Sequence, residues 1–351
     1  MKVSNVSYGS HLPQFRVTVN SRCGRACFFC RPSGEAVATA AGAELAVDDL
    51  IRVATAVHKT GISSIKLTGG DPALYEPLEE AVGRLRDEAG YTDIEVISRH
   101  PRIGARAATL ATLGVTRFNL SLDTLDEDLH HELTGIDDLA AIVEALGACV
   151  ATGVPVKVNM VVMGGINDDQ VVDLADFCGE MGVHTLKLLD VIKDLDEGAE
   201  SFARRLAIKR GKRLKDLYTP IEHAVDPFIG REVSRETRSQ GGLGHPMAAI
   251  TLDSGVQILL KDSTAGAWYG SVCHDCTFYP CHDALMALRL TADLRLQFCL
   301  LRGDNTIDLA PILTDKPSLQ RAIDEAMLPY AGAYFRTPSS KTLPLTMKAR
   351  A

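Results

Sequence analysis

Apolar segments alternate with amphipathic helical segments from about residue 15 to about residue 192. This alternation predicts repeated β/α units, which build a parallel sheet covered by helices. Gly61, Gly114, Gly153 and Gly182 each stand between a helical segment and the next apolar segment, where a left-handed residue commonly ends a helix. We count six units and therefore expect an α/β fold. The predicted strands cover residues 15–20, 64–68, 93–98, 117–122, 155–163 and 184–192.

Polar residues gather at the ends of these predicted strands. In a parallel β/α barrel, ligands bind where the strands end at their carboxyl edge. Gly69 and Gly70 follow the second strand, and adjacent glycines let a backbone approach a ligand closely, with amides that could hold a carboxylate or amine group. On the fifth strand Lys157 and Asn159 point to one face, and a lysine inside a closed sheet needs an anionic partner. The other strand-end residues are Asp71, Ser98, Asn119, Ser121, Lys187 and Asp190.

Three cysteines, Cys23, Cys27 and Cys30, lie within eight residues directly after the first predicted strand. Thiolates ligate iron, and a four-iron cluster normally takes four of them, so this loop predicts a [4Fe-4S] cluster with one iron open to a small molecule. A zinc site is the alternative. Zinc prefers a closed set of four ligands that usually arrive as two separated pairs, and no His or Cys close by completes the set, which favours the cluster.

A second cysteine group lies in the C-terminal third, at Cys273, Cys276, Cys281 and Cys299. Four thiols near one another could close a complete iron–sulfur cluster or a zinc site, and spacing alone does not identify the metal.

Composition narrows the class of protein. The chain has 351 residues and a formal net charge of −8, so it has no global attraction to nucleic acid or to anionic membranes. No apolar run approaches the ~18 residues of a membrane span, and residues 1–10 are polar and mixed, unlike a signal peptide. Nine cysteines without an export signal favour metal or redox chemistry over disulfides. We expect a cytoplasmic protein with no nucleic-acid or membrane partner.

The length predicts about two domains, or one barrel-like domain with an extension. We expect a β/α region at 1–195, a connector or lid at 196–246, a C-terminal cysteine domain at 247–315, and a helix with a tail at 316–351. The C-terminal domain begins with a predicted hairpin of strands 247–252 and 256–261. The basic run at 204–215 is either a solvated helix face or a phosphate-binding lid.

Several stretches together resemble the radical S-adenosylmethionine (SAM) superfamily and, within it, the GTP 3′,8-cyclase family of molybdenum cofactor biosynthesis. They are the cysteine loop and residues 16–22, 67–72, 117–126, 156–162 and 288–293. The resemblance implies a partial (β/α)6 TIM-type barrel with a C-terminal auxiliary iron–sulfur cluster extension. It also implies that the open iron binds SAM, that a donor such as flavodoxin or ferredoxin supplies an electron, and that a 5′-deoxyadenosyl radical abstracts hydrogen from the substrate.

The resemblance further implies roles for individual residues. Basic groups suit a nucleotide substrate because phosphates need several charge-assisted hydrogen bonds. The SAM-binding residues would be Phe29, Gly69, Gly70, Asp71, Ser98, Asn119, Ser121 and Ile192. The substrate-binding residues would be Arg16, Lys66, Lys157 and Arg289, and the catalytic residues Lys157, Asp190 and Arg289. The iron ligands would be Cys23, Cys27 and Cys30 for the first [4Fe-4S] cluster and Cys273, Cys276, Cys281 and Cys299 for a second.

Differences from the family pattern bear on the substrate. Lys66 stands where the family has arginine, and residues 285–289 replace a cysteine and an arginine of the auxiliary site. Four cysteines would ligate the auxiliary cluster fully and leave no iron for the substrate. We therefore expect a radical SAM enzyme, of the cyclase, lyase or C–C or C–H bond-forming type, that acts on a small nucleotide- or nucleoside-like substrate in a specialised biosynthetic pathway. The alternatives are a GTP 3′,8-cyclase, a peptide-modifying radical SAM enzyme, and a non-enzymatic iron–sulfur or zinc regulatory protein.

Overall fold

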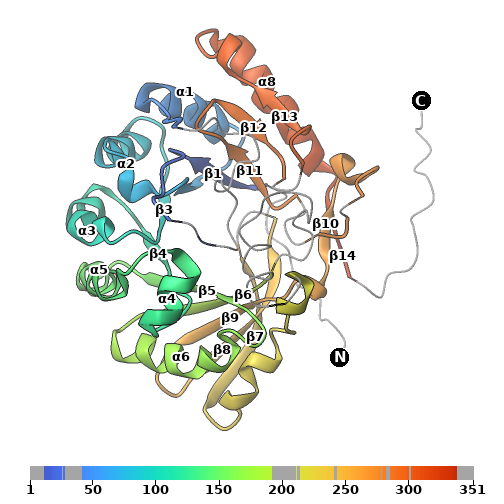
Figure 1. Cartoon of the computed structure of the whole chain (residues 1–351). Coiled ribbons are helices and arrows are strands. Elements are labelled where there is room, and N and C mark those ends of the chain that lie inside the picture. The colour runs from blue at the N-terminus through green and yellow to red at the C-terminus, as the bar shows by residue number, and fades with distance from the viewer. Residues whose placement is uncertain are drawn as a thin grey trace.

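One curled sheet of twelve strands forms a partial barrel in the computed structural model, which describes residues 12–25, 27, 42–191, 211, 214–240, 243–277, 279–281, 285–299 and 302–337 (Figure 1). The strand order is β13-β12-β11-β1-β2-β3-β4-β5-β6-β9-β8-β7. The strands of the first half are β1 Gln14–Thr18, β2 Ser64–Thr68, β3 Asp93–Ser98, β4 Arg117–Ser121, β5 Val156–Val162 and β6 Thr185–Asp190. The others are β7 Glu232–Gln240, β8 His245–Leu252, β9 Gln257–Lys261, β11 Ala287–Leu290, β12 Arg295–Gln297 and β13 Thr306–Asp308. The strands β10 Ala267–Tyr269 and β14 Tyr334–Arg336 form a separate pair.

Helices cover the outer side of the curled sheet (Figure 1). In the first of them the buried residues Leu50, Val53, Ala54 and Val57 repeat at helical spacing, so one stripe packs on the sheet while the opposite face stays polar. Gly114 ends another helix at φ 114°, a left-handed conformation that glycine adopts without steric cost. The described helices are α1 Val47–His58, α2 Leu78–Asp87, α3 Arg102–Leu113, α4 Glu127–Thr134, α5 Leu139–Ala151, α6 Val171–Glu180 and α8 Lys316–Ala331.

The six predicted strands are confirmed as β1 to β6, and neighbouring members pair in parallel. The predicted hairpin is also confirmed, because β8 and β9 pair antiparallel. None of the helices in the described ranges is long and apolar enough to cross a membrane.

Strands from the C-terminal half extend the parallel sheet on both edges. β9 pairs in parallel with β6, and β11 pairs in parallel with β1. In the described part of the chain, eight parallel strands therefore surround the inside of the curl, two more than the alternation pattern predicts. The expected C-terminal domain thus contributes strands to the same sheet as the β/α region, and the domain boundaries themselves stay a prediction.

Candidate active site

A cavity of ≈ 440 Å³ lies inside the curl of the sheet. Its lining combines the first cysteine loop, the strand ends and a set of basic side chains from both halves of the chain. The predicted site residues among that lining are Arg16, Cys23, Cys27, Lys66, Gly69, Gly70, Asp71, Ser98, Asn119, Ser121, Lys157 and Arg289. The fold therefore brings the expected cluster, SAM and substrate residues to one place.

Apart from the second cysteine group, four predicted site residues are not placed in this way. Phe29, Cys30 and Ile192 lie outside the described residues. Asp190 is not part of the cavity lining, and its Oδ2 accepts hydrogen bonds from the backbone N–H and the Oγ of Ser263, at 2.9 and 2.5 Å. Its carboxylate thus holds the turn after β9, and its catalytic role stays a prediction.

The glycine pair after β2 holds the cysteine loop in place. The N–H of Gly70 donates to the carbonyl of Asn20, and the N–H of Asp71 donates to the carbonyl of Arg22, both at 2.7 Å. A Cβ atom on Gly70 would lie 2.2 Å from the Arg22 carbonyl oxygen. The expectation that these amides are available to a ligand is therefore wrong for Gly70 and Asp71, because the loop backbone occupies them.

A buried arginine tethers the same loop to the helical layer. Arg25, between Cys23 and Cys27, forms a two-pronged ion pair with Asp138 at the start of α5. Asp138 also contacts Nε2 of His130 at 3.0 Å. Burial would raise the pKa of Asp138, but Arg25 and His130 lower it below its ordinary value, so the carboxylate stays charged. His130 of α4 and Asp138 at the start of α5 thus fix the position of Arg25 between the two thiols.

The pKa values of Cys23 and Cys27, the two described thiols of the loop, bear on whether they could ligate a metal. Burial, together with the carboxylate of Asp71 and the neighbouring Cys27, raises the pKa of Cys23 to about 11. Burial also raises the pKa of Cys27. A metal ligand must be a thiolate, so cationic iron would supply the charge that stabilises it here. Donor type and position at the cavity both fit a cluster.

Asp71 links the ends of β2 and β3. Its Oδ1 accepts hydrogen bonds from Ser98 Oγ at 2.6 Å and from the N–H of Ala73 at 2.9 Å, and its Oδ2 accepts from the N–H of Arg99 at 2.8 Å. Asp71 and Ser98, both predicted to bind SAM, are therefore hydrogen-bonded to each other. They shape the rim of the cavity through the backbone around them.

Two buried amide oxygens remain available beside this rim. Among the described residues, Oδ1 of Asn119 and Oδ1 of Asn159 have no hydrogen-bond partner. A buried acceptor without a partner is costly, which favours a bound ligand that donates hydrogen bonds. SAM and a nucleotide both carry such donors.

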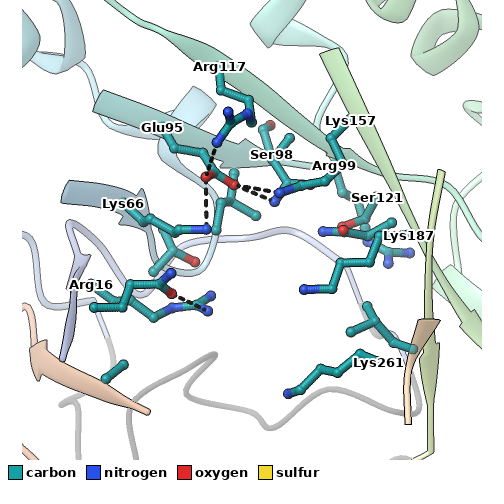
Figure 2. Close-up of a pocket in the computed structure, with 18 of the residues that line it drawn as sticks. Arg16, Lys66, Glu95, Ser98, Arg99, Arg117, Ser121, Lys157, Lys187 and Lys261 are labelled. Carbon is teal, nitrogen blue, oxygen red and sulfur yellow. Dashed lines mark hydrogen bonds and ion pairs between the residues drawn. The ribbon is translucent and has the colours of Figure 1, made fainter. Parts of the chain in front are cut away.

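Glu95 is a buried carboxylate that the sequence-based predictions did not include. It lies on β3, with Oε2 at 2.8 Å from Lys66 Nζ and at 3.6 Å from Arg117, and with Oε1 at 3.3 Å from Lys157 Nζ (Figure 2). The Nδ2 of Asn119 donates to Oε1 at 2.7 Å. Burial alone would raise the pKa of Glu95, but the ammonium groups of Lys66 and Lys157 hold it well below its usual range.

The anionic partner expected for Lys157 is therefore Glu95. Burial lowers the pKa of Lys157 to about 8 despite this partner. A signal was present in the sequence, because Glu95 interrupts the apolar residues Ile94, Val96 and Ile97 at an inward-facing position.

The opposite wall of the cavity carries two further lysines. Lys187 of β6 and Lys261 of β9 both extend into the open space (Figure 2). Within the described residues the side chain of Lys187 makes no hydrogen bond or ion pair, and burial together with Lys157 and Lys261 lowers its pKa well below the ordinary value. Burial and Lys261 also lower the pKa of His245 to about 3, so that histidine is neutral.

The second cysteine group is only partly assembled. Burial, followed by the neighbouring thiols of Cys276 and Cys299, raises the pKa of Cys273, so both of these thiols lie within electrostatic reach of Cys273. Cys281 is described and half-buried. No three Cys, His, Asp or Glu side chains in the described part of the chain are gathered closely enough to hold a metal.

Comparison with known proteins identifies relatives over most of the chain. Residues 17–178 match the sequence model of the Radical SAM superfamily. The chain is 30% identical over 307 residues to the probable GTP 3′,8-cyclase of Archaeoglobus fulgidus, covering 86% of this chain and 90% of that protein. It is 27% identical over 318 residues to the probable GTP 3′,8-cyclase of Pyrococcus abyssi, covering 90% and 94%.

Solved structures show the same fold at low identity. SuiB of Streptococcus suis bound to SAM aligns with a TM-score of 0.55 and 16% identity, covering 89% of this chain and 68% of that chain. Native anSMEcpe with bound AdoMet aligns with a TM-score of 0.50 and 13% identity, covering 82% and 74%. The partial-barrel expectation is thus confirmed.

Proposed function

Because this chain belongs to the radical SAM superfamily, we propose that it cleaves SAM reductively beside an open [4Fe-4S] cluster and abstracts hydrogen from a small, nucleotide-like substrate. The observation that carries the proposal is the shared cavity: Cys23 and Cys27 lie in the same lining as Arg16, Lys157 and Arg289. A radical generated from SAM beside these thiols would thus meet an anionic substrate held by the basic groups.

Cys23, Cys27 and Cys30 would hold the cluster. When bound, the cluster supplies one electron that breaks the C5′–S bond of SAM, releasing methionine and a 5′-deoxyadenosyl radical that takes a hydrogen atom from the substrate. The electron would come from a flavodoxin- or ferredoxin-type donor.

The chain's own residues position this chemistry. Arg25 and the Gly70 contact fix the loop that carries the thiols. The acceptor oxygens of Asn119 and Asn159 would receive hydrogen bonds from bound ligands. Arg16 and Arg289 lie side by side in the β1–β11 register and present guanidinium groups to the cavity, where they would bind phosphate through charge-assisted hydrogen bonds.

GTP 3′,8-cyclase activity is the second candidate, favoured by the names of the relatives. Against GTP as the substrate stands Glu95, which engages two of the four predicted substrate-binding residues.

A second [4Fe-4S] cluster at Cys273, Cys276, Cys281 and Cys299 is part of the proposal. The electrostatic proximity of Cys273, Cys276 and Cys299 supports it. Metal binding often completes a site that the metal-free chain holds only partly, because the ligands gain their charge and geometry together with the ion.

The test is substrate-dependent formation of 5′-deoxyadenosine. The anaerobically reconstituted protein is incubated with dithionite, SAM and a panel of nucleotides, and 5′-deoxyadenosine is measured by mass spectrometry. We expect product above the background without nucleotide, loss of all product in Cys27→Ala, and unchanged product in Cys149→Ala, whose thiol is buried in α5. Unchanged SAM cleavage in Cys27→Ala would refute the proposed function.

A further inference from the structure

A single register row of charged residues crosses five neighbouring strands. Through successive pairing, Arg289 of β11, Arg16 of β1, Lys66 of β2, Glu95 of β3 and Arg117 of β4 stand next to one another. Four members of this row are cations and one is a carboxylate. The cations alone would form a phosphate-binding surface, but the carboxylate changes what that surface can bind.

Glu95 engages the central cations of this region. Its two oxygens lie 2.8 Å from Lys66, 3.3 Å from Lys157 and 3.6 Å from Arg117. A phosphate that approached Lys66 or Lys157 would meet a buried negative charge a few ångströms away, and like charges in a poorly solvated site repel strongly. Glu95 therefore lowers the positive charge that this part of the cavity offers to an extended polyphosphate.

The described lining residues of the β6–β9 wall include no carboxylate. Leu189 pairs in register with Lys261, and Lys187 lies two residues earlier on the same strand face, so both lysines enter the cavity together. Within the described ranges Lys187 has no polar partner. A half-buried ammonium without a partner is costly in a poorly solvated cavity, which favours an anionic ligand at this position.

The chemistry of the two side chains indicates the class of anion. A bound dianion favours the charged form of both lysines, and two ammonium groups would then match the charge of about −2 on a phosphate monoester at neutral pH. A planar carboxylate is better matched by an arginine fork, whereas lysine acts as a point charge with three rotatable donors.

We propose that Glu95 is a specificity-determining residue, and that the substrate carries a single phosphate group, held by Lys187 and Lys261, rather than a triphosphate. This inference rests on the proposed function, because it takes the cavity as the substrate site. It implies a nucleoside monophosphate or a similar phosphate monoester.

The test uses inorganic phosphate and tripolyphosphate as probes, which do not depend on the identity of the base. Binding to the anaerobically reconstituted holoprotein is measured by isothermal titration calorimetry at low ionic strength. We expect tripolyphosphate to bind no more than about threefold more tightly than phosphate, and Lys187→Met and Lys261→Met each to weaken phosphate binding by about tenfold or more. Lys59→Met, at an exposed position outside the cavity lining, is the control and should leave the affinity unchanged.

Glu95→Gln removes the carboxylate charge while keeping an acceptor for Asn119. It should raise the affinity for tripolyphosphate by about tenfold and change that for phosphate by less than about threefold. If this variant fails to unfold cooperatively in a thermal scan, the lysine variants still decide the question. Wild-type protein that binds tripolyphosphate at least about tenfold more tightly than phosphate, or a Lys187→Met variant with unchanged phosphate affinity, would overturn the inference.

These outcomes separate the inference from the proposed function. Phosphate binding that depends on Lys187, without nucleotide-dependent 5′-deoxyadenosine, supports the subsite and contradicts the proposed function. Product formation that is equally efficient with mono- and triphosphates of one nucleoside contradicts the inference and leaves the proposed function standing.

Discussion

Replacing Gly70 with alanine tests how the cysteine loop is held. A Cβ atom there would lie 2.2 Å from the carbonyl oxygen of Arg22, 2.4 Å from its carbonyl carbon and 2.6 Å from that of Ser21. Non-bonded heavy atoms pack at about 3.5 Å, so the overlap exceeds about 1 Å. All three atoms belong to the backbone, and no side-chain rotation can relieve the overlap. The loop must therefore move away from the end of β2.

The loss of stability follows from two broken hydrogen bonds and from steric overlap. Moving the loop breaks the bonds of 2.7 Å from Gly70 to Asn20 and from Asp71 to Arg22, each worth about 1 kcal/mol net. Overpacking adds about 1–3 kcal/mol, so the free energy of unfolding should fall by about 3–5 kcal/mol. Cys23 follows Arg22 directly, and metal sites tolerate ligand displacements of only about 0.2 Å. The first cluster should be lost.

The assays are iron content after anaerobic reconstitution, 5′-deoxyadenosine formation and chemical denaturation. The matched control is Gly83→Ala on α2, where the nearest heavy atom to a new Cβ is a Leu113 methyl carbon at 3.6 Å. Alanine in a helix interior is favoured over glycine by about 0.5–1 kcal/mol, so this control should keep its iron and gain stability. A Gly70→Ala protein with wild-type iron content and stability would refute the reasoning.

Three further changes have defined outcomes. Asp138→Asn removes the charge opposite a buried guanidinium, so it should lower the free energy of unfolding by about 3 kcal/mol and reduce the iron content after reconstitution. Asp137→Asn, on a largely exposed side chain, should change neither quantity, and equal effects in the two variants would contradict the tether. The pKa of Lys157 is about 8, below its ordinary value of 10.5, so between pH 8 and pH 10 the unfolded chain binds more protons than the folded chain. The free energy of unfolding should therefore rise over this range by about 2 kcal/mol more in the wild type than in Lys157→Met. Parallel pH profiles of the two proteins would exclude this. Cys276→Ala should halve the iron content from about eight atoms per chain, because the second cluster would be lost. Cys178→Ala, whose thiol is buried in α6, should keep the full content. An unchanged iron content in Cys276→Ala would exclude Cys276 as a ligand.

The strand framework could be predicted because its signals are local. The second and third strands have the predicted bounds, Ser64–Thr68 and Asp93–Ser98. In each, apolar residues form a short run that is followed by a helical segment. Such a pattern can be recognised from residues close together in the sequence, without knowledge of distant contacts. The cysteine loop was equally visible, since its spacing lies within eight residues.

The partners across the cavity could not be predicted because they depend on register between distant strands. Lys157 needed a counter-ion, but only the β3–β4 and β4–β5 registers place Glu95 beside it. The pairing of β11 with β1 joins residues more than 270 positions apart and places Arg289 next to Arg16. No local pattern encodes such a pairing.

The two added strands also divide the tasks of the cavity. The thiols, Gly70 and Asp71 come from β1, β2 and the turns that follow them, so the part that we propose to bind SAM belongs to the first β/α units. Lys261 and Arg289 come from β9 and β11, which reach the cavity by pairing with the two edges of that set. Substitutions on β9 or β11 can therefore change the charge offered to a substrate without moving the cysteine loop. Glu95 lies on β3 between these two parts, and its contacts with Lys66 and Lys157 would set how much positive charge remains for the proposed substrate.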